Sequence, residues 1–360
     1  MKPLIIDAHQ DLAWNIKTFG RDYSQSAHET RQRENGNFAA KNNGDSLLGW
    51  PEFQKGRVAI VFATLFAAPI RAKESDWDPV YADAGQAHRL YKEQLDIYDR
   101  LFEQHPDKFC RLRSTRELVS VIEKWTQTDQ PSPTGLVMLM EGAEGIREID
   151  ELDDWWERGV RIIGPAWLSN RYCGGTREPG PLTREGRSLL AGMAERGFIL
   201  DISHMAWESA PEALDTYEGP IIASHANPIK MVKNGTANRF LTDEVIDRLI
   251  ERNGVIGIVP FNRFLNQQWK NSDPRGECSL EMVADHIDYI CQRAGSARHV
   301  GFGTDFDGGF GLQQVPPEID TIADLQKMVP LLSARGYTDN DIRFILGENW
   351  QTQLQKSLPA

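Results

Sequence analysis

Short apolar runs alternate with longer amphipathic stretches along the whole chain. The apolar runs are rich in Val, Ile and Leu, and eight of them have the length of buried strands. They span residues 4–12, 57–65, 135–142, 160–168, 198–204, 221–225, 254–261 and 299–309. Strands that alternate with helices are typical of βαβ units, so the pattern predicts an α/β fold with a parallel sheet.

The amphipathic stretches predict the helices that connect these strands. Apolar side chains recur at the helical period in the clearest of them, residues 83–104, and Gly197 stands where a helix C-terminus is expected. The other predicted helices are one that begins at Ser114 and those at residues 149–158, 183–196, 207–217, 242–252 and 280–294. Two more are expected in the tail from residue 321, the second of them at 338–346. The alternation predicts one (β/α)8 barrel of the TIM type, spanning residues 1–360, with extra C-terminal helices.

One polar stretch interrupts the alternation. Residues 13–56 lie between the first and second predicted strands and contain the turn signals Asn35-Gly36 and Asn43-Gly44. This stretch is too long for a plain βα loop. We therefore expect a functional insertion or lid over the strand ends.

Composition and charge restrict the class of protein. With 40% hydrophobic and 26% charged residues, the chain is typical of a soluble globular protein. Its net charge of −12 argues against nucleic acid or an anionic membrane surface as a partner. The four cysteines show no pairing pattern, the first strand begins almost at the N-terminus, and no apolar run is long enough to span a bilayer. We expect free thiols, no membrane partner and a cytoplasmic location.

Side chains that commonly bind metals stand at the carboxyl ends of five predicted strands. They are His9, Asp11, Glu141, His204, His225 and Asp305. The carboxyl ends of parallel barrel strands meet at one face, where the active sites of this fold lie. A single strand-end histidine is more often a structural residue, and an aspartate among glycines, such as Asp305 or Asp307, is often a turn former. Six such side chains at one face favour a metal site, and Glu141 after an apolar run has few other roles.

The donor types suggest which metal binds. Imidazole and carboxylate ligands without thiolates favour zinc, with manganese or iron as substitutes. Glu141 is the one obvious bridging carboxylate, which suggests two ions, and two ions about 3.5–4 Å apart can hold a hydroxide and polarise a carbonyl. Asp7 shares the strand face of His9 and is a candidate for supporting it. We expect the other histidines at the surface or at helix caps: His28, His88, His105, His286 and His299.

Together these motifs resemble the renal (membrane) dipeptidase family of dinuclear zinc peptidases. The matching segments are His9-x-Asp11, Glu141-Gly142, LDISH ending at His204, ASHANP containing His225, and GTDFDG at 303–308. The resemblance extends from the first predicted strand to the eighth. It implies that His9 and Asp11 bind one zinc ion, that His204 and His225 bind the other, and that Glu141 bridges them.

The resemblance also implies roles for residues around the metals. Arg239, in the segment 238–243, matches a family arginine that clamps the C-terminal carboxylate of the substrate. Asp305 matches an aspartate that shuttles a proton from water to the leaving amine. The family also suggests a homodimer. From the residues alone, the less favoured alternative for Arg239 is a surface arginine at a helix start.

One position departs from the family pattern. On the fourth strand the family has a Thr-His pair whose histidine contacts the substrate, whereas this chain has Ala166-Trp167. Trp167 replaces that histidine, and Asn170, Arg171 and Tyr172 in the next loop are candidates for the lost polar contact. The departure does not change the predicted metal ligands. It affects which substrate the pocket would accept.

The leading hypothesis is a cytoplasmic dizinc dipeptidase. It would act on short peptides with a free C-terminal carboxylate, through a hydroxide held between the ions. Trp167 supports an alternative hypothesis, an amidohydrolase that acts on N-acyl amino acids, lactones or other small amides. A non-catalytic relict of the barrel is a third alternative, although all six ligand positions are intact. A phosphate-binding isomerase or an aldolase is less favoured, because no glycine-rich phosphate loop follows the seventh strand.

Overall fold

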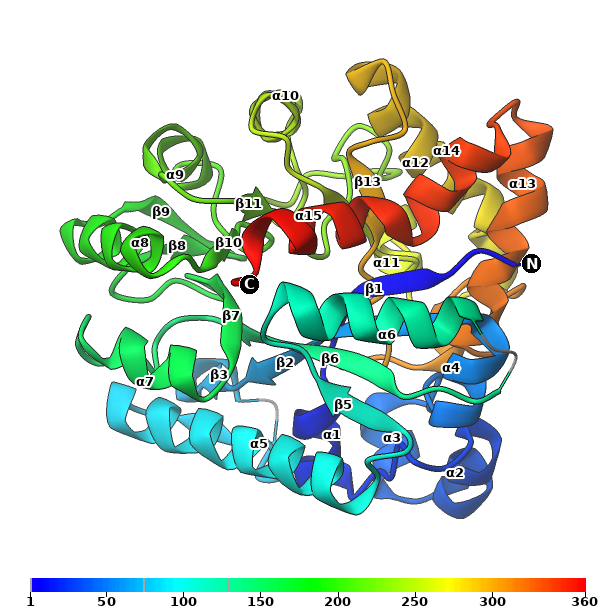
Figure 1. The fold of residues 1–360 in the computed structure, drawn as a ribbon, viewed down its shortest axis with the longest axis horizontal. Coiled ribbons are helices and arrows are strands. Elements are labelled where there is room, and N and C mark those ends of the chain that lie inside the picture. Colours follow the sequence, from blue (N-terminus) through cyan, green and yellow to red (C-terminus); the bar gives the residue numbers. More distant parts are fainter. Residues whose placement is uncertain (1, 74, 128–129) are drawn as a thin grey trace.

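The computed structural model describes residues 2–73, 75–127 and 130–360. Parallel strands form a nearly closed barrel in the order β11-β10-β7-β6-β2-β1-β13-β12, and a bridge between Ala223 and Ile256 joins the two ends of this order. The strands are β1 Ile5–Gln10, β2 Val58–Phe66, β6 Thr134–Glu141, β7 Val160–Gly164, β10 Ile199–Asp201, β11 Ile221–Ile222, β12 Ile256–Ile258 and β13 Val300–Phe302. The predicted (β/α)8 barrel is confirmed (Figure 1).

The strands are apolar on both faces because both faces are covered. β1 and β6 are buried along their whole length. The longest register joins β2 to β6, from Ile60 opposite Gly135 to Phe66 opposite Glu141. Several strands are shorter than predicted. In particular, β10 and β11 end before His204 and His225, so these two histidines stand in loops just beyond the strands.

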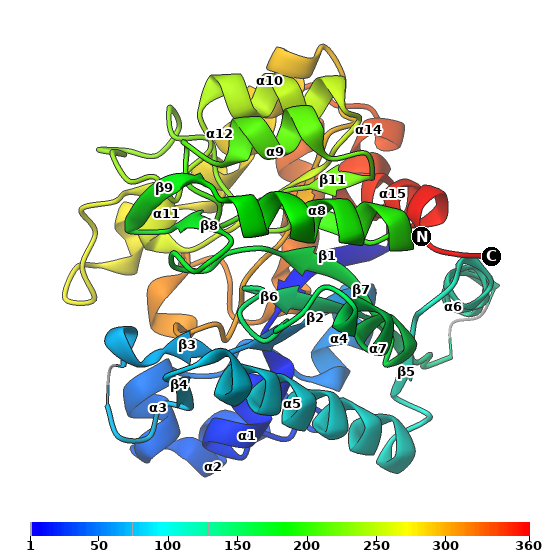
Figure 2. The same cartoon turned by 90° about the vertical axis from the view of Figure 1, so that its left-hand side faces the viewer.

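Helices cover the outside of the barrel (Figures 1 and 2). Those between barrel strands are α5 Ala84–Gln104, α6 Thr115–Gln127, α7 Glu151–Glu157, α8 Arg184–Arg196, α9 Ala210–Thr216, α10 Asp243–Glu251 and α12 Leu280–Ala294. Side-chain caps begin several of them; the hydroxyl groups of Thr183 and Thr242, for example, accept hydrogen bonds from backbone N–H groups in the first turns of α8 and α10. Gly197 ends α8 with a φ of 79°, as its position in the sequence predicts.

The C-terminal tail contains more helix than predicted. It comprises the 3₁₀ helix η4 Ile322–Lys327, α13 Met328–Ala334, α14 Asp339–Arg343, a π-helical segment Phe344–Glu348, and α15 Asn349–Ser357. The predicted helix end at residue 346 is wrong. Helical structure continues to Ser357, because Trp350 on α15 is buried against β13. Its Nε1 donates to Phe302 O at 3.0 Å. Gly301 makes room for the indole, since a Cβ there would lie 2.3 Å from Trp350 Nε1.

The insertion after β1 is helical. Its helices are α1 Leu12–Phe19, α2 Ala27–Glu34, α3 Phe38–Asn43 and α4 Trp50–Gly56, which form the blue group at the lower right of Figure 1. The remaining short elements are β3 Ala68–Pro69, η1 Ile70–Ala72, β4 Val80–Tyr81, β5 Phe109–Arg111, β8 Cys173–Gly175, β9 Glu178–Leu182, α11 Asn262–Leu265, η2 Arg275–Glu277 and η3 Leu312–Gln314. β8 and β9 form a hairpin in the loop after β7.

Two histidines lie in the interior, contrary to the prediction of surface or capping roles. His88 and His286 are 6% and 1% exposed. His88 Nδ1 lies 2.9 Å from Gly145 O, and burial lowers the pKa of His286 to about 3. The four cysteines are free, as predicted. Within the described residues, no helix combines the length and apolar character needed to cross a membrane.

Candidate metal centre

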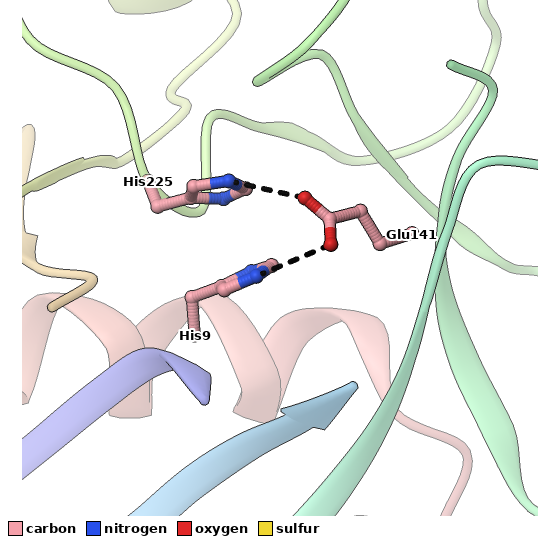
Figure 3. A group of neighbouring side chains, drawn as sticks. All are labelled: His9, Glu141 and His225. Atoms are coloured by element: carbon pink, nitrogen blue, oxygen red, sulfur yellow. Dashed lines mark ion pairs between the residues drawn. The ribbon is translucent and has the colours of Figure 1, made fainter. Parts of the chain in front are cut away.

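Glu141, the last residue of β6, lies between histidines from three other strand ends. Its Oε1 is 2.9 Å from His204 Nε2 and 3.3 Å from His225 Nε2, and its Oε2 is 3.6 Å from His9 Nε2. Figure 3 shows His9 and His225 directed at the two oxygens of this carboxylate. Each of these histidines is 63 or more positions from Glu141 in the sequence, and the barrel brings them together.

Two aspartates complete the cluster on the other side of His9. His9 Nε2 is 4.0 Å from Asp11 Oδ1 and 3.9 Å from Asp305 Oδ1. Within the described residues, two groups offer three ligand atoms within 4.8 Å of one another: His9, Glu141 and His225, and His9, Asp11 and Asp305. We call His204 and His225 the histidine half of the cluster, and Asp11 and Asp305 the aspartate half. His9 and Glu141 lie between the halves.

The electrostatics of the cluster suit a cation. Burial alone would lower the pKa of His9, but the carboxylates of Glu141, Asp11 and Asp305 raise it to about 10. Burial, together with the charge of Glu141, raises the pKa of Asp11 to about 6. His9 Nε2 is buried and has no hydrogen-bond partner among the described residues. Three carboxylates and an unpartnered imidazole nitrogen in one buried space are the donor set that a divalent metal takes.

Hydroxyl groups orient the histidine half. His204 Nδ1 lies 2.8 Å from Thr176 Oγ1, and His225 Nδ1 lies 2.8 Å from Ser224 Oγ. When Nδ1 donates to the hydroxyl oxygen, Nε2 keeps its lone pair for a metal. Asp201 accepts from Ser224 Oγ at 2.5 Å and from Ser203 Oγ at 2.6 Å, which fixes both serines.

Sequence reasoning missed most of these supporting residues. A usable signal was present in the repeated Ser-His pairs at 203–204 and 224–225, each at a strand end. No local signal marks Thr176, which lies 28 positions before His204. The hairpin of β8 and β9 carries it back to the cluster.

The aspartate half is held differently. Thr64 Oγ1, on β2, donates to Asp11 Oδ1. Asp7 does not contact His9 by a hydrogen bond. Instead, the Asp7 carboxylate accepts hydrogen bonds from the backbone N–H and the hydroxyl of Thr304, both at 2.6 Å. These bonds hold Thr304, the residue before Asp305, in place. Asp305 N–H in turn donates to His9 O at 3.1 Å.

Arg239 and Trp167 lie beside the histidine half. Arg239 is buried, and its Nη1 and Nη2 donate to Ser203 O at 2.8 Å and His225 O at 2.7 Å. Burial lowers the pKa of Arg239 to about 10, so the guanidinium stays charged at neutral pH. The ring centroid of Trp167 lies 6.4 Å from that of His204.

The side-chain polar groups of Asn170 and Tyr172 bond to backbone groups, those of Asn170 within its own loop and that of Tyr172 in the loop after β6. Asn170 Nδ2 donates to Pro165 O at 2.7 Å, and its Oδ1 accepts from Tyr172 N–H at 2.8 Å. The Tyr172 hydroxyl donates to Ile146 O at 2.5 Å. These contacts shape the loop beyond Trp167 and do not involve the six cluster residues.

The whole chain matches a known family. The family model described as membrane dipeptidase (peptidase family M19) matches residues 2–356. The chain belongs to this family. As an M19 member it is a metal-dependent peptide hydrolase, and the resemblance inferred from its motifs is confirmed.

Individual M19 relatives are distant. The chain is 27% identical over 307 residues to dipeptidase verJ of Clonostachys rogersoniana, covering 82% of this chain and 72% of that protein. It is 23% identical over 360 residues to dipeptidase aclJ of Aspergillus oryzae, covering 96% and 76%. A metallopeptidase of Rhodobacter sphaeroides, solved with a phosphinate mimic of L-Ala-D-Ala, has the same fold, with a TM-score of 0.78, 22% identity, and coverage of 99% of this chain and 100% of that one.

Proposed function

We propose that this M19 member is a dinuclear zinc dipeptidase that hydrolyses dipeptides with a free C-terminal carboxylate. The observation that carries the proposal is the pair of three-residue groups that share His9. One group contains Glu141 and His225, and the other contains Asp11 and Asp305. The single lone pair of His9 Nε2 can serve only one ion, so the carboxylate shared by two ions is Glu141, whose Oε1 lies beside His204 and His225 and whose Oε2 lies beside His9.

The donor set fits zinc, with manganese or iron as substitutes. His204 and His225 would hold one ion, His9 and Asp11 the other, and Glu141 both. Bound ions would supply a water activated for attack at neutral pH and would polarise the peptide carbonyl. The protein contributes the fixed positions of these ligands, and the hydroxyls of Thr176 and Ser224 keep the imidazoles oriented.

Asp305 is the proposed proton carrier. Its side chain is 16% exposed, more than those of the other cluster residues that pair with His9. Burial, with the charges of Asp11 and Glu141, raises the pKa of Asp305 well above its usual value, although His9 opposes the shift. A carboxyl group with a raised pKa can hold a proton on Oδ1 and release it to a leaving amine.

Arg239 is the proposed clamp for the substrate carboxylate. No carboxylate of the described residues lies within ion-pair distance of this buried guanidinium, and the polar contacts it makes are to backbone carbonyl groups. The carboxylates of Asp305, Glu141 and Asp201 act on the guanidinium only from beyond ion-pair distance. A buried charge without a direct counter-ion is costly, so an anionic ligand group is a natural partner. We also propose that three residues line the substrate pocket: Trp167, Asn170 and Tyr172. Trp167 lies next to His204, and the other two shape the loop that follows it.

A second candidate function rests on Trp167. An indole beside His204 would favour an apolar group near the reacting carbonyl, as in an N-acyl amino acid. A cytoplasmic location and a homodimer remain predictions from the sequence and from the family resemblance.

Metal removal and a substrate panel test the proposal together. Chelation should abolish hydrolysis, and two equivalents of zinc should restore it. The panel contains dipeptides with L- and D-residues at the C-terminus, the same dipeptides with a C-terminal amide, and N-acyl amino acids. We expect free dipeptides to be preferred.

Arg239→Met should lower kcat/KM for free dipeptides about 10- to 100-fold, as expected for a lost charge-assisted contact, while kcat/KM for the amidated dipeptides should change little. Preference for the N-acyl series would replace the dipeptidase assignment with the second candidate.

A further inference from the structure

The loop after β13 carries two aspartates that face different parts of the molecule. Asp305 belongs to the aspartate half of the cluster, whereas Asp307 is fully buried against the insertion. Both residues have left-handed backbone angles, with φ of 56° and 65°. L-residues adopt this conformation rarely, and they keep it only where the surroundings hold it. The interpretation of Asp307 as a simple turn former is therefore incomplete.

Among the described residues, the insertion supplies the donors that hold the Asp307 carboxylate. Its carboxylate accepts from the Tyr23 hydroxyl (3.0 Å), Ser46 Oγ (2.7 Å) and Leu47 N–H (2.8 Å), and pairs with Arg21 Nη1 (3.1 Å). Its backbone carbonyl accepts from the side-chain amides of Asn15 and Asn43, both at 2.9 Å. These six donors from the insertion, together with Gly309 N–H at 3.1 Å from the same carbonyl oxygen, fix both the side chain and the peptide plane of Asp307.

The same network reaches the second aspartate of the cluster. Asn15 Nδ2 also donates to Asp11 O at 2.9 Å. Arg21 is buried and pairs with Glu34 (3.0 Å) as well as with Asp307. The contacts therefore form one connected unit that joins the segments after β1 and after β13 through the insertion.

The loop fits closely against both carboxylates. A Cβ added at Gly308 would lie 2.1 Å from Asp305 Oδ1 and 2.8 Å from Asp11 Oδ2. A small rotation of the turn at Asp307 would therefore change the position of Asp305 relative to Asp11.

We infer that Asp307 is a positioning residue: the insertion holds it and thereby places Asp305 beside Asp11 and His9. The insertion is then a structural part of the metal centre, in addition to any role as a cover. This inference rests on the proposed function only in taking the cluster to bind metal.

Two variants of the network test it in the full-length protein. Asp307→Asn replaces the carboxylate. The double variant Tyr23→Phe/Ser46→Ala removes two of its donors and leaves the contacts that involve backbone groups in place. This second variant remains informative if the first one folds poorly. The control is Glu52→Gln, another buried carboxylate of the insertion, which accepts from Ser26 Oγ (2.7 Å) and Ala27 N–H (2.9 Å) outside this network. The readouts are zinc affinity from competition with a chromogenic chelator, kcat and KM on a dipeptide, and the melting temperature.

We expect the network variants to bind one zinc equivalent at least tenfold more weakly and to lose at least tenfold in kcat, with KM changing less. The control should lower the melting temperature and leave zinc affinity and kcat near wild type. Unchanged affinity and kcat in the network variants would overturn the inference, as would equal losses in the control. A wild-type protein that binds two zinc ions but cleaves no dipeptide would overturn the proposed function, while the zinc affinities would still test the role of Asp307.

Discussion

The histidine half and the aspartate half of the cluster lie side by side, but different parts of the chain hold them. His204 and His225 follow β10 and β11 within a few residues, and hydroxyls from the barrel and from the β8–β9 hairpin orient their rings. Asp11 and Asp305 also follow strands, but the turn that carries Asp305 is held through Asp307 by the insertion.

This difference separates two ways of placing a side chain of the candidate metal centre on a barrel. A strand fixes the direction of a side chain just beyond its end, so a few hydrogen bonds to Nδ1 are enough for a histidine. A carboxylate on a left-handed turn needs the whole turn to be held, and Asp307 provides the buried ion pair for that purpose. Substitutions in the two halves should therefore have distinct effects on metal binding.

Glu141→Gln should have the largest effect, because Glu141 contacts His204 and His225 directly and also contacts His9, which lies next to the aspartate half. We expect loss of both ions and a fall in kcat/KM of roughly a thousandfold or more, since bound ions contribute several kcal/mol to transition-state stabilisation. Metal content by mass spectrometry and turnover of a dipeptide give the two measurements.

Glu144→Gln is the matched control for this change. Glu144 lies three positions later in the loop after β6 and belongs to neither three-residue group. Its variant should keep both ions and most of the activity. If Glu141→Gln kept full metal content and turnover, the comparison between two halves joined by one carboxylate would be wrong.

The sequence predicts the histidine half better than the surroundings of the aspartate half. Apolar runs are local patterns, so the eight strands and the candidate ligands at their ends can be predicted from them. Tyr23 and Asp307 are 284 positions apart, and no periodicity links them. The buried positions of His88 and His286 are missed for a related reason, because a polar residue on a helix does not reveal that it faces the interior.

Gly308→Ala should affect the aspartate half alone. The new Cβ would overlap Asp305 Oδ1 and crowd Asp11 Oδ2, at 2.1 and 2.8 Å. We expect the free energy of unfolding to fall by about 1–3 kcal/mol from overpacking. We also expect the affinity for one zinc ion to fall at least tenfold while the other ion stays bound. Chelator competition and thermal unfolding measure the two effects.

Gly276→Ala, in the short 3₁₀ helix η2, controls for the replacement of a glycine by alanine, because a Cβ there meets nothing within 4 Å. It should change stability by less than about 0.5 kcal/mol and leave zinc binding intact. Equal loss of both ions in Gly308→Ala would mean that the halves do not respond separately.

Thr176→Val should have the smallest effect, confined to the histidine half. The substitution keeps the shape of the side chain and removes the hydroxyl that lies 2.8 Å from His204 Nδ1. The imidazole then loses the partner that fixes its tautomer and ring angle, and supporting residues of this kind typically change metal affinity about 10- to 100-fold. We expect the lower end of this range, because Glu141 still lies 2.9 Å from His204 Nε2 and limits the rotation of the ring.

Thr216→Val, on α9, is the matched control, because its hydroxyl donates to Glu212 O on the protein surface. The cobalt-substituted enzyme provides the sharper readout, since the visible spectrum of each ion reports its own ligands. A change confined to one cobalt spectrum in Thr176→Val, and to the other in Gly308→Ala, would establish that the halves are supported independently. The same spectral change in both variants would instead mean that Glu141 and His9 transmit any disturbance across the cluster, so that the two supports act on a single unit.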